Sequence, residues 1–266
     1  MHSPLTPLTF NLNGRRALVT GGAQGIGLAI TQVLVAQGAR VHICGTNAAA
    51  LKETQQSLPG IGISVADITK ESQVAAMFAE IDQQMGGLDI LVNNAGIAGP
   101  TAAIEDITLA DWNQCLDVNL TGTFLCTRSA VPGMKQRRHG SIINIGSVAS
   151  RLAFPRRSPY SATKYGVIGL TETWATELGP HQIRVNAVLP GIVEGPRQDR
   201  VLSASAQAAG VTVDEMRERV LQRVSLRSMV SAGDIGAAVV FLCSDAGASI
   251  TGQSLSVDGN VETLVR

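Results

Sequence analysis

The sequence has little of what marks several classes of protein. Aromatic residues make up 3% of the 266 positions, and lysine plus arginine balance aspartate plus glutamate at 21 each. Without a net charge, the chain has no general attraction to nucleic acid or to anionic lipid. The cysteines form no C-x-x-C pair and no cluster with histidine, which argues against a disulfide framework and a metal site. We expect buried, free thiols at Cys44, Cys115, Cys126 and Cys243.

Long hydrophobic runs are also absent. No segment reaches the ~18 apolar residues of a membrane span, and residues 1–12 lack the charged and apolar regions of a signal peptide. No repeat, low-complexity tract or Pro/Gly linker divides the chain. Residues 1–266 are therefore expected to form one soluble, cytoplasmic domain that binds neither nucleic acid nor membrane.

What the sequence does contain is a series of short apolar segments that alternate with longer helical ones. Alternating strands and helices are typical of parallel βαβ units, and runs without polar residues indicate strands covered on both faces. We predict an α/β fold, a single doubly wound Rossmann-type domain with a seven-stranded parallel sheet and helices on both faces. Its strands are expected at Ala17–Thr20, Val41–Cys44, Ile61–Val65, Ile90–Val92, Ser141–Ile145, Ile183–Val188 and Ser254–Val257.

One segment interrupts the alternation, between the sixth and seventh predicted strands. Residues 192–227 include a helical stretch at Val213–Val224. Ligands of open α/β sheets bind beyond the carboxyl ends of the strands. We therefore expect residues 192–227 to form a lid over a substrate.

A glycine-rich loop follows the first predicted strand directly and precedes a helical pattern at Leu28–Gln37. Gly21 permits a tight turn, Gly25 lets the backbone approach a pyrophosphate, and Gly27 allows close packing of helix and strand. The helix N-terminus would then face the anion. This context indicates a dinucleotide site.

The spacing Thr20-Gly21-x-x-x-Gly25-x-Gly27, followed by Asn93-Asn94-Ala95-Gly96, resembles the short-chain dehydrogenase/reductase superfamily from Leu12 to Val257. The resemblance implies that Asp67 contacts adenine and that Pro190-Gly191 borders the nicotinamide. It implies a cofactor site made of Gly21, Gln24, Gly25, Ile26, Gly27, Thr46, Asp67, Ile68, Asn93, Ala95, Gly96, Tyr160, Lys164, Pro190, Gly191 and Val193.

Tyr160 and Lys164 lie four residues apart at the start of a predicted helix, so both project from one face. A phenol alone is a poor base at neutral pH, and an adjacent ammonium favours the phenolate. Tyr160 can then exchange the proton of a substrate hydroxyl, which Ser147 can hydrogen-bond. The resemblance adds Asn119, which would hold a water in the proton path. These residues predict NAD(P)-dependent hydride transfer between a secondary alcohol or ketone and a nicotinamide.

Selectivity between NAD and NADP depends on the end of the second predicted strand. NAD-selective relatives place an acidic residue there, whereas this sequence has Gly45-Thr46-Asn47. No arginine replaces the acid, and Gln24 stands where NADP users often have a basic residue. A 2′-phosphate would lack a guanidinium partner, so NAD is favoured and NADP stays possible.

Arginines near the predicted active site suggest an anionic substrate. Arg151, with help from Arg157 and Arg197, could bind a carboxylate bidentately, and Arg266 could reach a neighbouring subunit's site. A solvated surface run explains Arg156 and Arg157 equally well. The few aromatics argue against a pocket for large flat rings. A hydroxy or keto-deoxy sugar acid is favoured, by similarity to bacterial dehydrogenases of deoxy-sugar acids.

Other functions stay open. A 3-oxoacyl thioester reductase using NADPH shares these motifs, and the basic cluster Lys135–His139 could bind its acyl carrier. A redox-sensing regulator on the same fold is a further alternative, although such relatives tend to lose the tyrosine or the lysine. We also expect a homotetramer, because long helices at Asp111–Lys135 and Tyr160–Leu178 carry more Val, Leu, Phe and Trp than one domain buries.

Overall fold

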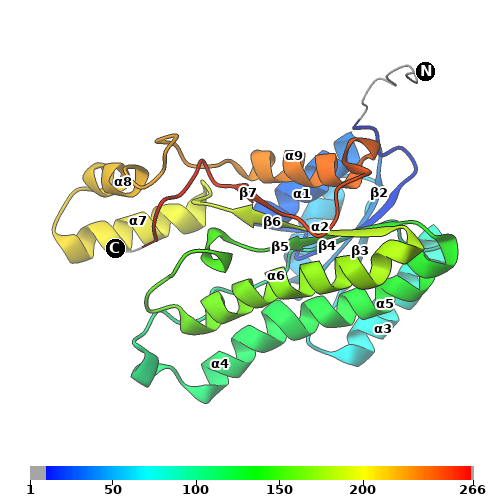
Figure 1. The fold of residues 1–266 in the computed structure, drawn as a ribbon, viewed down its shortest axis with the longest axis horizontal. Coiled ribbons are helices and arrows are strands. Elements are labelled where there is room, and N and C mark those ends of the chain that lie inside the picture. The colour runs from blue at the N-terminus through cyan, green and yellow to red at the C-terminus, as the bar shows by residue number, and fades with distance from the viewer. Residues whose placement is uncertain (1–9, 265–266) are drawn as a thin grey trace.

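The computed structural model describes residues 10–264, except for the side chains of Arg197, Ala204 and Ala208. A parallel seven-stranded sheet crosses the molecule in the order β3-β2-β1-β4-β5-β6-β7 (Figure 1). Every predicted strand is confirmed within one or two residues at its ends. The strands are β1 (Arg16–Thr20), β2 (Arg40–Gly45), β3 (Gly62–Val65), β4 (Ile90–Asn93), β5 (Gly140–Ile145), β6 (Ile183–Pro190) and β7 (Ser254–Val257).

Helices cover both faces of the sheet, as predicted (Figure 1). Successive strand residues point to opposite faces, so in β1 Leu18 packs into one apolar core while Val19 packs into the other. One face carries α1 (Gly25–Ala36), α2 (Ala48–Ser57) and α9 (Ala232–Cys243). The other carries α3 (Glu71–Met85), α5 (Gly122–Arg137) and α6 (Ser158–Leu178).

The predicted helix at Asp111–Lys135 forms, but its α-helical geometry is interrupted by a π-helical turn. The chain forms α4 (Leu109–Leu116), then a π-helical turn at Asp117–Thr121, and then α5. A π-helical turn holds an extra residue and often marks a functional site. Here it contains Asn119, which is 2% exposed. The irregularity therefore places a predicted catalytic residue inside the protein.

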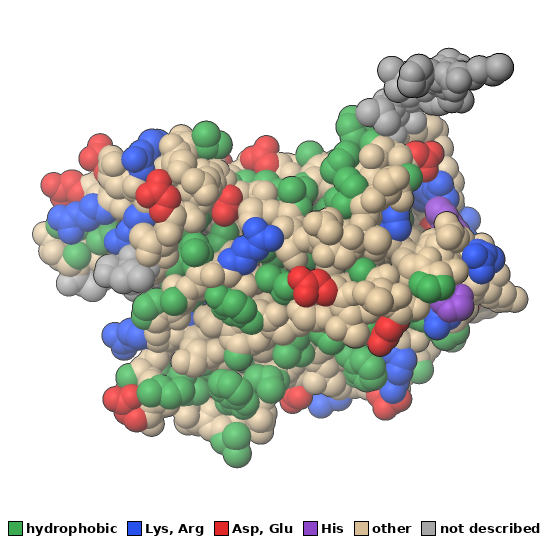
Figure 2. All heavy atoms as spheres, in the orientation of Figure 1, with side chains coloured by type: hydrophobic (Ala, Val, Ile, Leu, Met, Phe, Trp, Pro, Cys, Tyr) green, Lys and Arg blue, Asp and Glu red, His purple; other side chains and the backbone are tan. Residues whose placement is uncertain are grey.

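After β6 the chain forms α7 (Pro196–Ala209) and α8 (Val213–Leu221), which project beyond the carboxyl ends of the strands (Figure 1). The predicted helix at Val213–Val224 thus ends at Leu221. A parallel bridge between Val193 and Val230 joins the two ends of this segment. In Figure 2 the outline of the molecule is notched between these helices and the helices below them. That residues 192–227 cover a substrate stays a prediction.

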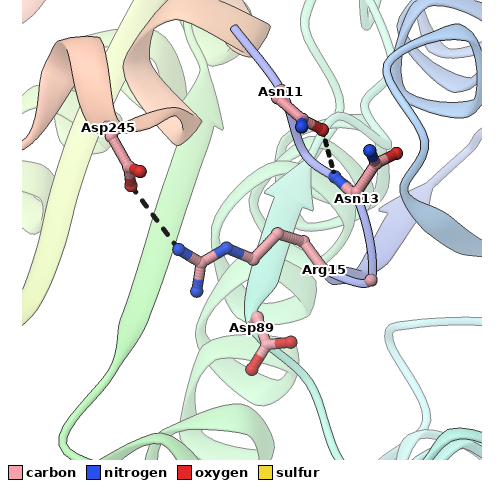
Figure 3. Close-up of a pocket in the computed structure, with 6 residues that line it drawn as sticks. Asn11, Asn13, Arg15, Asp89 and Asp245 are labelled. Atoms are coloured by element: carbon pink, nitrogen blue, oxygen red, sulfur yellow. Dashed lines mark hydrogen bonds and ion pairs between the residues drawn. The ribbon is translucent and has the colours of Figure 1, made fainter. Parts of the chain in front are cut away.

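A polar cavity of about 370 Å³ lies at the amino-terminal edge of the sheet, opposite the predicted catalytic residues (Figure 3). Inside it, Arg15 pairs with Asp245 at 3.5 Å. Beside it, Arg16 binds Asp89 through Nε and Nη2 at 2.8 and 2.5 Å. Burial opposes ionisation of Asp89, but these bonds hold its pKa below the usual range. This cluster ties the start of β1 to the start of β4.

The four cysteines are free and buried, as predicted. Burial raises the pKa of the Cys44 thiol to about 12 and that of the Cys243 thiol to about 11, so neither forms a thiolate at neutral pH. Between residues 10 and 264, no helix is long and apolar enough to cross a bilayer. Within the same range, no group of three or more His, Cys, Asp or Glu side chains is arranged to hold a metal ion.

Candidate active site

The glycine loop adopts the backbone that a dinucleotide requires. Gly21 and Gly25 have positive φ angles of 63° and 53°, which favour glycine. A Cβ on Gly27 would lie 2.1 Å from the carbonyl oxygen of Gly21, so no side chain fits there. Around Gly25 an added Cβ would meet no atom within 4 Å, which leaves space for a ligand.

The N-terminus of α1 suits a phosphate. The helix starts at Gly25, earlier than the predicted Leu28, because glycines contribute no apolar periodicity to the sequence. Gln24, its N-cap residue, makes no side-chain cap bond, and the first turn holds no acidic residue. The first backbone N–H groups of a helix have no partner within the helix, and here the N-cap side chain does not bind them. The loop fits a pyrophosphate.

The segment Asn93-Asn94-Ala95-Gly96 braces this loop. The Asn94 side chain donates to the carbonyl oxygens of Thr20 and Gly21 at 2.9 and 3.2 Å. Asn93, 4% exposed, instead donates to Asn144 at 2.9 Å and supports the sheet. Asn94 is not among the predicted cofactor residues. Its position between two of them, Asn93 and Ala95, is a sequence signal that points to it.

The other predicted cofactor residues lie along the carboxyl edge of the sheet. Strand order reverses between β1 and β4, and this is where such folds bind nucleotides. Thr46 is exposed just after β2, and Asp67 follows β3, where its carboxylate accepts from the backbone and hydroxyl of Thr69. Ile68 is buried against Gly122. Pro190 ends β6, and Gly191 and Val193 follow it.

Tyr160 and Lys164 lie in the first turns of α6, and Ser147 follows β5. The Lys164 ammonium is 5.7 Å from the centre of the Tyr160 ring. Its Nζ donates to the carbonyl oxygen of Ile145 at 2.8 Å, which fixes the lysine in a buried position. The Ser147 hydroxyl accepts from the N–H of Ala149 at 3.1 Å, so its own proton is directed away from that bond.

The π-helical turn brings Asn119 to the same place. Its Oδ1 accepts from the N–H of Ile97 at 2.8 Å, and its Nδ2 donates to the Ile97 carbonyl at 3.0 Å. Asn119 and Lys164 both approach Gly96. A Cβ added to Gly96 would lie 3.2 Å from Asn119 Oδ1 and 3.7 Å from Lys164 Nζ. The four predicted catalytic residues thus come from three separate elements and converge at the carboxyl edge of the sheet.

Of the predicted substrate arginines, Arg157 lies beside these residues. Its guanidinium is 5.6 Å from the centre of the Tyr160 ring and 5.4 Å from that of Phe154. It also donates to the Thr101 hydroxyl. Cation–π contact with both rings holds the guanidinium next to Tyr160.

Arg151, the second of these arginines, binds the last strand of the sheet. Its guanidinium donates to the Ser254 carbonyl at 2.6 Å and to the Ser256 hydroxyl at 3.3 Å. Along the sheet, Ser254 is level with Asn144, and Ser256 is level with Leu189, one residue before the end of β6. That Arg151 chiefly holds the substrate stays a prediction, and its bonds to β7 make Arg157 the stronger candidate. The Arg197 side chain and Arg266 lie outside the described residues.

This fold and site define a Rossmann-type oxidoreductase that uses a dinucleotide. The chain belongs to the short-chain dehydrogenase/reductase superfamily: the enoyl-(acyl carrier protein) reductase family matches residues 21–261. It is therefore an NAD(P)-dependent oxidoreductase that acts on CH–OH groups. Solved relatives carry NAD⁺ or NADPH.

Individual relatives differ in substrate. D-beta-hydroxybutyrate dehydrogenase from Cupriavidus necator is 39% identical over 253 residues, which cover 93% of this chain and 98% of that protein. The 3-oxoacyl-[acyl-carrier-protein] reductase FabG of Thermotoga maritima is 35% identical over 94% of this chain and 98% of its own length. A structure provisionally described as a gluconate dehydrogenase from Agrobacterium tumefaciens matches with a TM-score of 0.89 and 32% identity, over 97% of this chain and 100% of that one.

Proposed function

We propose that the protein is an NAD-dependent dehydrogenase of a small hydroxy acid, either a short hydroxy acid or a sugar acid. The observation that carries this proposal is the Arg157 guanidinium, 5.6 Å from the centre of the Tyr160 ring. A planar guanidinium binds a carboxylate bidentately. A hydroxy acid could thus place its carboxylate on Arg157 and its hydroxyl on Tyr160.

In this mechanism the protein binds, orients and moves a proton. Tyr160 takes the proton of the substrate hydroxyl while Ser147 hydrogen-bonds the same oxygen. Lys164, held by the Ile145 carbonyl, places a positive charge 5.7 Å from the centre of the Tyr160 ring. The glycine loop and Pro190-Gly191 would hold a nicotinamide dinucleotide, which would supply the hydride acceptor. For ketone reduction the same residues return the proton.

Names of relatives support an acid substrate. One is called a hydroxybutyrate dehydrogenase and another, provisionally, a gluconate dehydrogenase, and both names denote hydroxy acids. Few aromatic residues, 3% of the chain, are available to line a pocket for large flat rings. We therefore infer the substrate class from the positive charge of Arg157 beside Tyr160, not from an apolar pocket.

The cofactor should be NAD rather than NADP. Thr46 and Gln24 are exposed and carry no charge to meet a 2′-phosphate, and Asn47 is engaged in capping α2. The missing charge-assisted bonds cost about 1.5 to 3 kcal/mol, so NAD⁺ should bind roughly tenfold or more tightly. Titration with each cofactor checks this preference, and a lower dissociation constant for NADP⁺ would overturn it.

The proposal is tested by steady-state kinetics on matched substrates. With NAD⁺, D-3-hydroxybutyrate and D-gluconate are compared with their neutral counterparts, 3-hydroxybutyramide and D-glucitol. We expect reduced nicotinamide to form from at least one acid with a kcat/KM at least about tenfold above that of its neutral partner. Equal rates on acid and neutral analogue would contradict an anionic substrate.

The second candidate, reduction of a 3-oxoacyl thioester, has the FabG relative in its favour. The basic cluster Lys135–His139 does not support it, because Arg137 donates to the Leu88 carbonyl and Arg138 to that of Pro180, both away from Tyr160. Acetoacetyl-coenzyme A with NADPH is the discriminating assay. Turnover faster than that of either acid would favour the reductase.

We also propose a homotetramer. Three large side chains stay exposed on the layer of α4, α5 and α6: Leu109 at 73%, Phe124 at 43% and Tyr165 at 48%. Figure 2 shows apolar side chains gathered over these helices. Trp174, expected among them, packs against the core instead. Light scattering should give a tetramer mass that Phe124→Asp lowers, whereas a monomer mass for the wild type at micromolar concentration would refute the assembly.

A further inference from the structure

One buried hydroxyl joins the two helical segments that carry the proposed catalytic groups. Thr163, between Tyr160 and Lys164 in α6, is 0% exposed. Its Oγ1 donates to the backbone carbonyl of Tyr160 at 2.8 Å and accepts from Asn119 Nδ2 at 3.0 Å. A hydroxyl has one proton, so these two bonds use it as donor and acceptor at once. Thr163 thus ties the π-helical turn to the first turn of α6.

The orientation of the Asn119 amide follows from its partners. Since the N–H of Ile97 can only donate, the atom that faces it is Oδ1, and Nδ2 is directed toward α6. One Nδ2 proton is given to the Ile97 carbonyl at 3.0 Å. The second lies between Thr163 Oγ1 at 3.0 Å and Cys115 Sγ at 3.4 Å. Sulfur accepts weakly, so Thr163 is the principal partner of that proton.

We propose that Thr163 is a positioning residue for the reaction. Its hydroxyl holds Asn119 and the backbone of Tyr160 in one geometry, so that the groups that move the proton stay aligned. The proposal rests on the roles assigned above to Tyr160 and Asn119. It adds a residue outside the catalytic tetrad, which acts through its neighbours and does not touch the substrate.

A second threonine of α6 provides a matched control. Thr171 is also 0% exposed; its hydroxyl donates to the Val167 carbonyl at 2.7 Å and accepts from Asn144 Nδ2 at 2.9 Å. Chemistry, helix and burial are therefore the same at both positions. Asn144, however, belongs to β5 and supports the sheet, whereas Asn119 lies beside Gly96, which Lys164 also approaches. A purely structural role predicts the same phenotype for both threonines.

The test compares Thr163→Val, Thr163→Ser and Thr171→Val in the full-length protein. Valine matches threonine in shape and removes the hydroxyl, leaving the amide proton to face a methyl group. Assays use NAD⁺ and whichever acid of the substrate screen is turned over fastest. We expect Thr163→Val to lower kcat about tenfold and to raise the solvent deuterium isotope effect, because a displaced proton path slows proton transfer. NAD⁺ affinity should stay unchanged, and Thr163→Ser should recover kcat.

Thr171→Val should lower the melting temperature to a similar extent but leave kcat and the isotope effect at wild-type values. The inference is overturned if Thr163→Val keeps wild-type kcat, or if Thr171→Val loses as much. Tyr160→Phe in the same assay distinguishes failure of the catalytic assignment from failure of the role proposed for Thr163. If it retains activity, the catalytic assignment fails; if it is inactive while Thr163→Val is normal, only the role of Thr163 fails.

Discussion

Tyr160→Phe should lower kcat by about 10³-fold or more while NAD⁺ still binds, because the substitution removes only the oxygen that transfers the proton. The phenyl ring keeps its neighbours: the Phe154 ring at 6.4 Å, the Arg157 guanidinium at 5.6 Å and the Lys164 ammonium at 5.7 Å. Packing around the ring is thus preserved. Turnover of D-3-hydroxybutyrate and D-gluconate, together with NAD⁺ titration, measures both halves of the prediction.

The chain offers a matched control for this variant. Its one other tyrosine, Tyr165, lies in the same helix and is 48% exposed. Tyr165→Phe also removes one phenolic oxygen, and it should leave kcat at the wild-type value. A Tyr160→Phe variant that kept more than about a tenth of the wild-type rate, with chemistry limiting turnover, would show that another group transfers the proton.

Arg157→Ala should raise KM for the acid substrate about 10- to 100-fold, the cost of losing a charge-assisted pair of hydrogen bonds. Binding of NAD⁺ should not change. Arg157→Lys should recover part of the binding, because an ammonium keeps the charge but cannot reproduce the planar fork. The neutral analogues should lose little, which separates the loss of charge recognition from damage to the pocket.

Arg151→Ala is the control for the second prediction. The Arg151 guanidinium is bound to β7 through Ser254 and Ser256, so its removal should leave KM for the acid unchanged. The two variants therefore distinguish the structure from the sequence-based expectation. If Arg151→Ala raised KM and Arg157→Ala did not, the substrate would be held as the sequence alone suggested.

Much of the fold could be predicted from sequence because its signals are local. Strands buried on both faces appear as uninterrupted apolar runs, such as Ile90 to Val92 in β4. The glycine loop was recognisable because Gly21, Gly25 and Gly27 meet steric demands that a single turn sets by itself. Tyr160 and Lys164 share a helix face by spacing alone.

What sequence could not supply depends on contacts between distant segments. Nothing in the run around Asn119 signals a π-helical turn or the bonds that its side chain makes to Ile97 and Thr163, which are 22 and 44 residues away in the sequence. The arginines present the same difficulty. Arg151 and Arg157 lie in one loop, yet the Arg151 side chain binds β7, whereas the Arg157 guanidinium lies over the Tyr160 ring.

The central claim, that this site removes a hydride from the carbon of a hydroxy acid, is tested most directly by isotope transfer. The acid turned over fastest is prepared with deuterium on its carbinol carbon and incubated with NAD⁺ and the wild-type enzyme. Mass spectrometry of the reduced cofactor should then show deuterium transferred from the substrate, and Tyr160→Phe should yield almost none. Reduced cofactor without deuterium, or no reduced cofactor from any acid tested, would contradict the account.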